Sequence, residues 1–211
     1  MPTIYDISRT LSPALAVWPG DPPFEADQMQ SLAAGDAVNL TRLRFSAHSG
    51  THLDAPWHTE PQNVHPADLP LEVFIGPARV VTVTRRAGGI VPADFAAIDL
   101  TGVTRLLVHT WYSNEVPDER FDERFPYPTP ELMDWLADRG MILLGVDVPS
   151  VDGFGNPTLA AHHRQFARGM YNLENLLLRG VPDGDYELVA LPLKIAGVCG
   201  SPVRAILRPL R

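Results

Sequence analysis

The sequence has one cysteine, an excess of acidic over basic residues and no long apolar run. The single Cys199 rules out a disulfide within the chain and is typical of a reducing compartment. The net charge of -8 argues against the clustered basic face by which proteins bind nucleic acid. The longest apolar runs, such as residues 141–144, are too short to span a bilayer, and the first residues show no secretion signal. We therefore expect a soluble, cytoplasmic protein with no nucleic-acid or membrane partner.

The sequence also lacks the features expected of a serine hydrolase or of an enzyme with a cysteine nucleophile. The Gly-x-Ser-x-Gly elbow of many serine hydrolases is missing, because neither Ser49 nor Ser201 has the flanking glycines that the pattern requires. Cys199 has no sequence neighbour that offers a base. We therefore expect Cys199 to be a small buried residue and not a nucleophile.

The composition that is present is that of one globular domain. A chain of 211 residues with 45% hydrophobic and 20% charged residues can bury a sizeable core. The 21 prolines and 16 glycines indicate many turns between the apolar segments. We predict a single domain over residues 1–211.

Apolar periodicity predicts strands that alternate with helices. Residues 42–48 alternate between polar and apolar, which predicts a half-buried strand. Residues 141–147 are almost entirely apolar, as is typical of a fully buried strand. Thr129-Pro130 has the residue types that open a helix, and a further helix is predicted near residues 161–170. Together these patterns indicate an α/β fold, a single layered domain in which helices flank a mixed sheet.

Residues 113–128 differ from the rest because they are highly charged, with Phe121, Phe125 and Tyr127 interleaved. Such a stretch is typical of a surface excursion. It can shape the mouth of a pocket, but a plain solvated loop is the more common outcome and is what we expect.

The densest group of metal-ligand residue types lies within residues 48–58. It contains three of the seven histidines and one aspartate, namely His48, His52, Asp54 and His58. All four stand at even offsets, so an extended backbone would project their side chains to one face. Gly50 and Pro56 disfavour a regular helix here. Since imidazole and carboxylate groups bind zinc-type cations, the stretch predicts a metal site.

Residues outside this stretch must complete a catalytic metal site. The best second source is His162, with Glu174 twelve residues later. Taken alone this pairing is weak, because a histidine pair on a helix is usually exposed and Glu174 could be a solvated charge. The residues leave His58 open as a ligand or an acid/base group. They also leave Trp18 open as an aromatic surface for a substrate or as a residue that packs a loop.

In its pattern His-x-Gly-Thr-His-x-Asp-x-Pro-x-His, the stretch 48–58 resembles the cyclase-type metal-dependent hydrolase family. The resemblance covers nearly the whole chain. Further blocks similar to the family are residues 6–8, 17–21, 75–79, 145–152, 159–163, 173–175, 184–188 and 201–205. The histidine motif specifies the family, and the full set of blocks points to its formamidase branch.

The resemblance implies a site with two zinc ions per subunit. His48, His52 and Asp54 would hold one metal. His162 would hold the other, and Asp54 and Glu174 would bridge the two. Manganese or cobalt would also suit these ligands.

The resemblance also implies a reaction, the hydrolysis of N-formyl-L-kynurenine to L-kynurenine and formate in tryptophan degradation. Water activated by the metal, with its pKa lowered from about 15.7 to roughly 7, would attack the formyl carbon. His58 would give a proton to the aniline nitrogen, and Trp18 would lie against the aromatic ring. The family fold is a swivelling β/β/α domain, usually a homodimer. The expected partners are therefore a small aromatic formamide and a second copy of the chain.

Two alternatives remain open. Residues 156–159 read Asn-Pro-Thr-Leu, where the family's formamidases commonly carry a Ser-Lys-Thr-Leu type sequence, so a different substrate within the family stays open. A ring-opening relative that acts on isatin or a similar cyclic amide would share the metal site. The other alternative is a non-enzymatic protein in which the metal only stabilises the fold. Structural zinc sites are usually rich in cysteine, so the presence of a single cysteine counts against this alternative.

Overall fold

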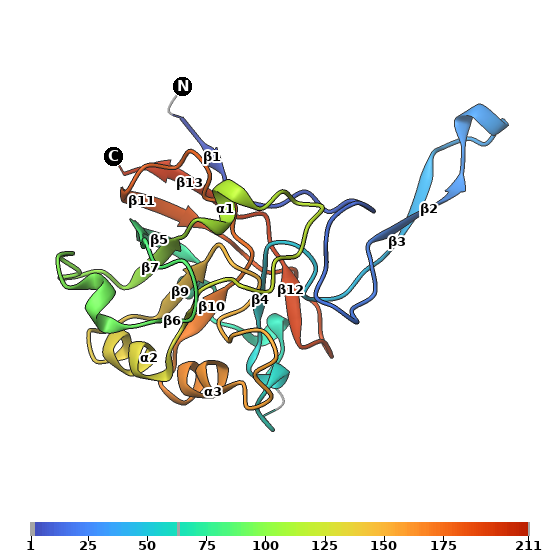
Figure 1. Ribbon diagram of the computed structural model, residues 1–211. Helices are drawn as coiled ribbons and strands as arrows, with labels where there is room; N and C mark the ends of the chain where they lie inside the picture. Colours follow the sequence, from blue (N-terminus) through green and yellow to red (C-terminus); the bar gives the residue numbers. More distant parts are fainter. Residues whose placement is uncertain (1–2, 63, 211) are drawn as a thin grey trace.

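A seven-stranded mixed sheet forms the centre of the molecule (Figure 1). The computed structural model describes residues 3–62 and 64–210. The sheet contains β1 (Tyr5–Asp6), β5 (Ile75–Thr82), β7 (Arg105–His109), β9 (Leu143–Val146), β10 (Tyr171–Leu173), β11 (Gly184–Val189) and β13 (Ile206–Pro209). Its order is β1-β13-β11-β5-β7-β9-β10. The strands from β5 to β10 run parallel, and the pairs from β1 to β5 run antiparallel.

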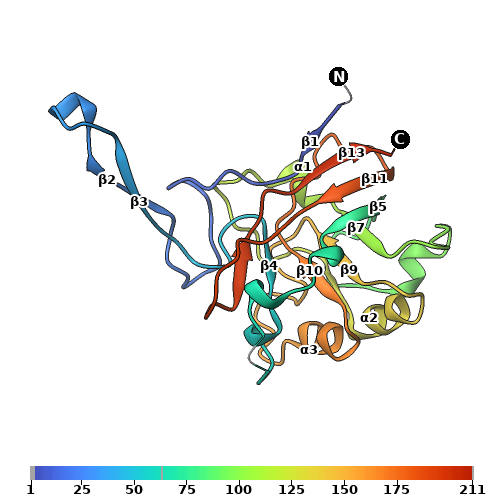
Figure 2. The ribbon, with the colours of Figure 1, turned by 180° about the vertical axis from the view of Figure 1, so that it is seen from behind.

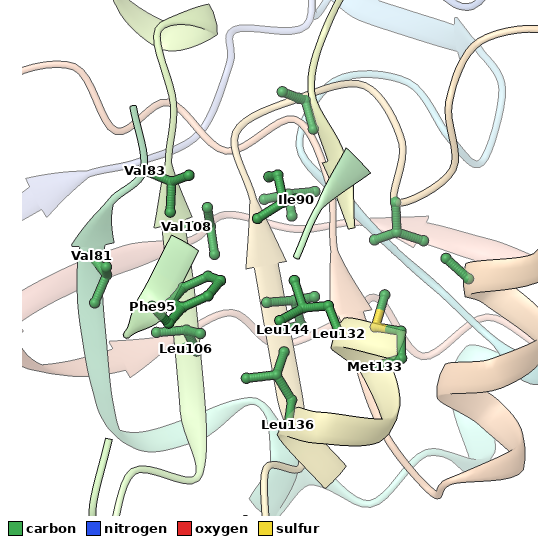
Figure 3. Packing of buried hydrophobic residues seen from close by; sticks show 14 of the residues in the cluster. Val81, Val83, Ile90, Phe95, Leu106, Val108, Leu132, Met133, Leu136 and Leu144 are labelled. Carbon is green, nitrogen blue, oxygen red and sulfur yellow. The ribbon is translucent and has the colours of Figure 1, made fainter. Parts of the chain in front are cut away.

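Helices α2 (Pro130–Ala137) and α3 (Ala160–Ala167) lie side by side against this sheet (Figure 1). Leu132 and Leu136 of α2 belong to one buried cluster with Leu106 of β7 and Leu144 of β9 (Figure 3). Strands β7 and β9 are buried at every position, as parallel strands covered on both faces are. The predicted α/β fold with a mixed sheet and flanking helices is confirmed, as is the buried strand within residues 141–147.

Both helices begin close to where the sequence predicts. The Thr129 side chain accepts a hydrogen bond of 3.2 Å from the backbone N–H of Leu132, and Pro130 occupies the first turn of α2. Helix α3 follows Leu159, whose φ of 45° is in the left-handed region. The chain therefore turns sharply just before His162, so the helix begins at the candidate site.

A second buried cluster packs around Leu53, Phe74 and Leu188. Leu53 lies at the centre of β4 (His52–Asp54), which pairs antiparallel with β12 (Gly200–Pro202). Because side chains alternate along a strand, burial of Leu53 in this core turns His52 and Asp54 to the opposite side. One apolar residue thus sets the direction of two candidate ligands.

The remaining elements are short. They are the strands β6 (Gly89–Ile90) and β8 (Tyr127–Pro128), the helix α1 (Tyr112–Glu115), and the 3-10 helices η1 (Leu32–Ala34), η2 (Pro56–His58), η3 (Pro66–Asp68), η4 (Leu71–Val73) and η5 (Pro92–Phe95). Within the described ranges, no helix has the length and apolar character needed to cross a membrane. The assignment of residues 1–211 to a single domain stays a prediction.

A hairpin of β2 (Glu25–Gln30) and β3 (Leu40–Arg44) extends away from the body in both ribbon views (Figures 1 and 2). Every residue of β3 is exposed, and Leu43 keeps 54% of its surface. The prediction of a half-buried strand over residues 42–48 is therefore wrong. The alternation is present, but the strand ends at Arg44 and its apolar face is uncovered among the described residues.

Candidate active site

Backbone pairing brings Glu174 against the histidine motif. The N–H of His52 donates to the carbonyl of Glu174 at 3.2 Å, and the N–H of Glu174 donates back to His52 at 2.9 Å. Glu174 follows directly after β10, so the edge of the main sheet positions it. The two side chains meet, with His52 Nε2 at 3.3 Å from Glu174 Oε2.

Two glycines allow the histidine rings to approach the backbone. Gly50 has a φ of 65°, and its carbonyl oxygen lies 2.9 Å from Nδ1 of His52. This contact leaves Nε2 of His52 facing the carboxylates. A Cβ at Gly200 would lie 2.9 Å from Cε1 of His48 and 2.8 Å from the Leu53 carbonyl oxygen. Glycine at position 200 therefore leaves the space that the His48 ring occupies.

The two buried carboxylates each lie between the same two imidazoles. Asp54 Oδ1 is 2.8 Å from His48 Nδ1 and 3.6 Å from His52 Nε2. Asp54 Oδ2 is instead 3.2 Å from His162 Nε2. Glu174 repeats the arrangement, since its Oε2 faces His52 while its Oε1 lies 3.4 Å from His162. Each carboxylate therefore offers one oxygen to each side of the cluster, as bridging ligands of a two-metal site do.

The donor atoms of this cluster fit a divalent metal. Asp54 is fully buried, yet its Oδ1 accepts no hydrogen bond of acceptable geometry, although His48 Nδ1 is only 2.8 Å away. A cation held between these two atoms would satisfy both of them. The ligand atoms of His48, His52 and Asp54 lie within 4.8 Å of one another, as do those of Asp54, His58 and His162. Nitrogen and carboxylate donors suit zinc and also admit manganese or cobalt.

Two residues that the sequence reasoning missed hold this arrangement in place. Asp152 Oδ2 lies 2.7 Å from His162 Nδ1, and the Asp152 carboxylate also accepts the first backbone N–H groups of α3. The Asn172 amide donates to Asp54 at 2.6 Å and to Glu174 at 3.1 Å. Two signals for Asp152 were available in the sequence: its place in the family-like block 145–152, and its acidic character ahead of a predicted helix. Nothing in the local sequence marks Asn172.

Cys199 also belongs to the site, contrary to the prediction of a small buried residue without a base nearby. It is half-buried, and its Sγ lies 3.1 Å from Nε2 of His48. The hydrogen bonds with His48 and then His58 lower the pKa of the Cys199 thiol to about 6. The ring of His58 lies 4.2 Å from that of His48 and 5.5 Å from that of His162, measured between centroids. His58 is thus placed at the same cavity as the ligand cluster.

The charges in the cluster shift one another's protonation. Burial acts to raise the pKa of Asp54, but the imidazoles of His162 and His48 hold it well below its ordinary value. Burial acts to lower the pKa of His48, but Asp54 and Cys199 raise it to about 10. The pKa of His162 is likewise raised against burial, by Asp152 and then by the other carboxylates. The carboxylates therefore attract positive charge to these nitrogens, which either protons or a cation can supply.

The cluster opens into a cavity of about 310 Å³ that Trp18 also lines. Trp18 packs edge-on against Phe121 and at a tilt against Phe154, with ring centroids 5.4 and 5.2 Å apart. It therefore packs these loops together, and its role as a surface for the substrate stays a prediction. Arg120 and Phe121 of residues 113–128 line the same cavity, and Phe125 is buried. The prediction of a plain solvated loop is therefore wrong, and the alternative of a pocket wall holds.

The fold and the cluster together define a class of protein, an α/β scaffold that presents metal-ligand residues in the wall of a cavity. The sequence pattern of the family described as "Putative cyclase" matches residues 5–153. The chain therefore belongs to the cyclase family, and the predicted resemblance is confirmed. Among curated proteins, the kynurenine formamidases of Bacillus cereus and Bacillus cytotoxicus are each 42% identical to this chain over 205 residues, or 97% of this chain and of each relative.

Solved structures share the fold over its whole length. One is described as a potential metal-dependent hydrolase with cyclase activity, and it matches with a TM-score of 0.87 at 25% identity, covering 100% of both chains. Another is isatin hydrolase A from Labrenzia aggregata, with a TM-score of 0.83 at 25% identity, covering 99% of this chain and 94% of that one. The proteins that share sequence or fold with this chain are thus described by two kinds of activity, kynurenine formamidase and isatin hydrolase.

Proposed function

We propose that this protein is a metal-dependent amidohydrolase that cleaves N-formyl-L-kynurenine to L-kynurenine and formate in tryptophan degradation. The observation that carries the proposal is the pair of carboxylates, Asp54 and Glu174, each of which lies between His52 and His162 beside a cavity. The 42% identity to proteins named kynurenine formamidase, over 97% of the chain, supports the choice of substrate. Release of L-kynurenine by the metal-loaded protein, followed by absorbance, tests it.

We assign two zinc ions per chain to the cluster. His48, His52 and Asp54 would hold one ion. His162 would hold the other, with Asp54 and Glu174 as the bridges. The separate placement of the carboxylate oxygens supports this division. Elemental analysis of the purified protein identifies the metal and its stoichiometry.

The chain's own residues account for the remaining chemistry. A bound divalent metal would supply water with a pKa of about 7 and would polarise the formyl carbonyl. His58 is assigned the role of general acid, which donates a proton to the aniline nitrogen as the carbon–nitrogen bond breaks. Trp18 presents an aromatic surface to the substrate ring, and its contacts with Phe121 and Phe154 hold that surface in place.

The alternative function is ring opening of isatin or a related cyclic amide. It is favoured by the structural similarity to isatin hydrolase A, with a TM-score of 0.83. The metal chemistry would be the same, so only the cavity distinguishes the two substrates. Parallel assays with N-formyl-L-kynurenine and isatin separate them, and a clear preference for isatin would overturn the first choice.

A purely structural metal is the less favoured reading. Catalytic metal sites keep a position open to water, whereas structural sites are closed by protein ligands. His48, His52, His162 and Glu174 all line an open cavity, which supports catalysis. Unfolding of the protein by a chelator, together with no turnover of either amide, would support the structural reading instead.

Replacement of Cys199 by alanine should weaken metal binding by about 10- to 100-fold, the usual effect of removing a partner that orients a ligand. Cys199 Sγ contacts Nε2 of His48 at 3.1 Å and so keeps Nδ1 turned toward Asp54. Cys199→Ser keeps a hydrogen-bond acceptor and should recover most of the affinity. Competition with a chromophoric chelator measures both variants. An alanine variant with wild-type affinity would contradict this role.

Metal binding at pH 7 should release protons. The pKa of His48 is raised to about 10 and that of His162 is also raised, so both rings carry protons in the metal-free protein. An imidazole must lose its extra proton to bind a cation, so affinity should increase as the pH rises toward about 10. Calorimetry in two buffers with different ionisation enthalpies measures the release. Equal heats in the two buffers would contradict it.

We also propose that the protein is a cytoplasmic homodimer. The exposed apolar side chains of the hairpin formed by β2 and β3 support the dimer, since Leu32, Leu40 and Leu43 keep 52–58% of their surface. An isolated two-stranded hairpin is only marginally stable in water, so cover by a second copy would stabilise it. Shortening the hairpin to a tight turn should give a monomer in sedimentation equilibrium. A shortened chain that remains dimeric would place the interface elsewhere.

A further inference from the structure

Arginine side chains in this molecule are mostly held by carboxylates. Two hydrogen bonds to one Asp or Glu side chain are formed by each of Arg79, Arg85, Arg86, Arg124 and Arg204. Arg120 differs from all of these. Its nearest carboxylate oxygen, on Asp122, is 4.0 Å away, and its side-chain hydrogen bond goes to the backbone carbonyl of Glu115 at 3.2 Å.

The reason is that the neighbouring carboxylate is already engaged. Arg124 binds both oxygens of Asp122, at 2.9 and 2.7 Å. Arg120 consequently keeps unused donors on its guanidinium, and its side chain is 54% exposed where it lines the cavity. A guanidinium in that state matches a carboxylate with two parallel hydrogen bonds.

A free negative charge lines the same cavity. The Asp21 carboxylate lines it without a hydrogen bond or ion pair anywhere in residues 3–62 and 64–210. The backbone N–H of Asp21 donates to the carbonyl of Trp18 at 2.9 Å, so a turn places the carboxylate near the aromatic wall. The other acidic residues that line the cavity all have partners: Asp118 pairs with Arg9 at 2.6 Å, and Asp152 and Glu174 both contact His162.

The two loops that carry these charges are joined. The backbone N–H of Ala16 donates to the carbonyl of Asp118 at 2.8 Å, which ties the segment before Trp18 to the segment that carries Arg120. The cavity therefore combines the metal-ligand cluster, an aromatic surface, a carboxylate without a partner among the described residues and a guanidinium that keeps unused donors.

We infer that Arg120 and Asp21 form a subsite for the zwitterionic α-amino-acid group of the substrate. The Arg120 guanidinium binds the α-carboxylate, and the Asp21 carboxylate binds the α-ammonium group. The inference rests on the proposed function and deepens it, because the substrate class becomes an aryl formamide with a free amino-acid tail. A neutral ring such as isatin offers neither charge to this pair.

The test compares two formamides with the same reacting group. One is N-formyl-L-kynurenine, and the other is 2-formamidoacetophenone, which lacks the amino-acid tail. The wild-type holoenzyme should prefer the first in kcat/KM. Arg120→Gln and Asp21→Asn should each reduce that preference by about 10- to 100-fold, as expected for a lost hydrogen bond to a charged group, while turnover of 2-formamidoacetophenone stays unchanged. Arg204→Gln, which removes an arginine paired with Asp6 on the surface, is the matched control and should change neither rate.

Equilibrium binding gives a second measurement that does not depend on turnover. L-kynurenine should bind the wild type more tightly than 2-aminoacetophenone does, and Arg120→Gln should remove the difference. Equal effects of Arg120→Gln on both formamides would overturn the subsite while leaving the formamidase function intact. Failure of the wild type to cleave either formamide would instead overturn the proposed function and the subsite with it.

Discussion

Replacement of Asp54 by asparagine should lower turnover of the formamide by at least about 1,000-fold, because the metal that activates water and polarises the carbonyl would no longer be held. Asp54 is fully buried, and one of its carboxylate oxygens lies 2.8 Å from His48 Nδ1 while the other lies 3.2 Å from His162 Nε2. Asparagine keeps the size of the side chain but removes its charge and one of its two acceptor oxygens. Bound metal, measured by elemental analysis, should fall together with turnover.

Asp185→Asn is the matched control for this change. Asp185 is also a paired carboxylate, but it binds Arg79 on the surface and its side chain is 48% exposed. That variant should keep its metal and its rate, since exposed ion pairs contribute little to stability. Circular dichroism checks that Asp54→Asn remains folded. A folded Asp54→Asn protein with wild-type turnover would contradict the assignment of the site.

Replacement of His58 by alanine should lower turnover by about 100- to 10,000-fold, the usual contribution of a general acid or base. Metal content should remain nearly unchanged, because the other cluster residues supply the bridging carboxylates and the remaining imidazoles. Added imidazole should restore part of the rate if the lost group only carried a proton.

The control for His58→Ala is His163→Ala. His163 lies on α3 next to His162, but its ring is paired with Glu60 at 2.7 Å and is 50% exposed. It should be replaceable without loss of rate. A His58→Ala protein that loses metal would make His58 a ligand, in agreement with its position near Asp54 and His162, and would contradict its role as a proton carrier.

The direction of the ligands in the histidine motif could be predicted from the sequence because it depends on a local rule. Side chains at even offsets on an extended chain share a face, and His52 and Asp54 do so on β4, with Leu53 turned into the core. The proximity of His162 and Glu174 to that motif followed from the family resemblance. Their residue types alone did not decide it.

The residues that hold the ligands could not be predicted in this way. Asn172 and Asp54 are 118 positions apart, and Cys199 and His48 are 151 positions apart. These contacts exist because β10 lies at the end of the parallel strands and β12 pairs with β4. Sheet order is set by the packing of the whole chain, and no local periodicity encodes it.

The hairpin of β2 and β3 and the charged residues 113–128 also show what the sequence pattern does not predict. The alternation around Leu43 predicted an apolar face correctly, but a pattern does not state which surface covers that face. In residues 113–128 the charge suggested solvation, whereas Phe121 and Phe125 pack against Trp18 and make the segment a cavity wall. Aromatic packing on Trp18 and the ion pair between Asp118 and buried Arg9 together hold the segment at the cavity.

The central claim is that metal held between Asp54, Glu174 and the imidazoles drives amide hydrolysis. Titration of the metal-free protein with zinc, while bound zinc and the release of L-kynurenine from N-formyl-L-kynurenine are both measured, tests it most directly. We predict no turnover without metal and a rate that rises with occupancy until two ions are bound per chain. Full turnover by the metal-free protein, or a rate independent of zinc occupancy, would contradict the claim.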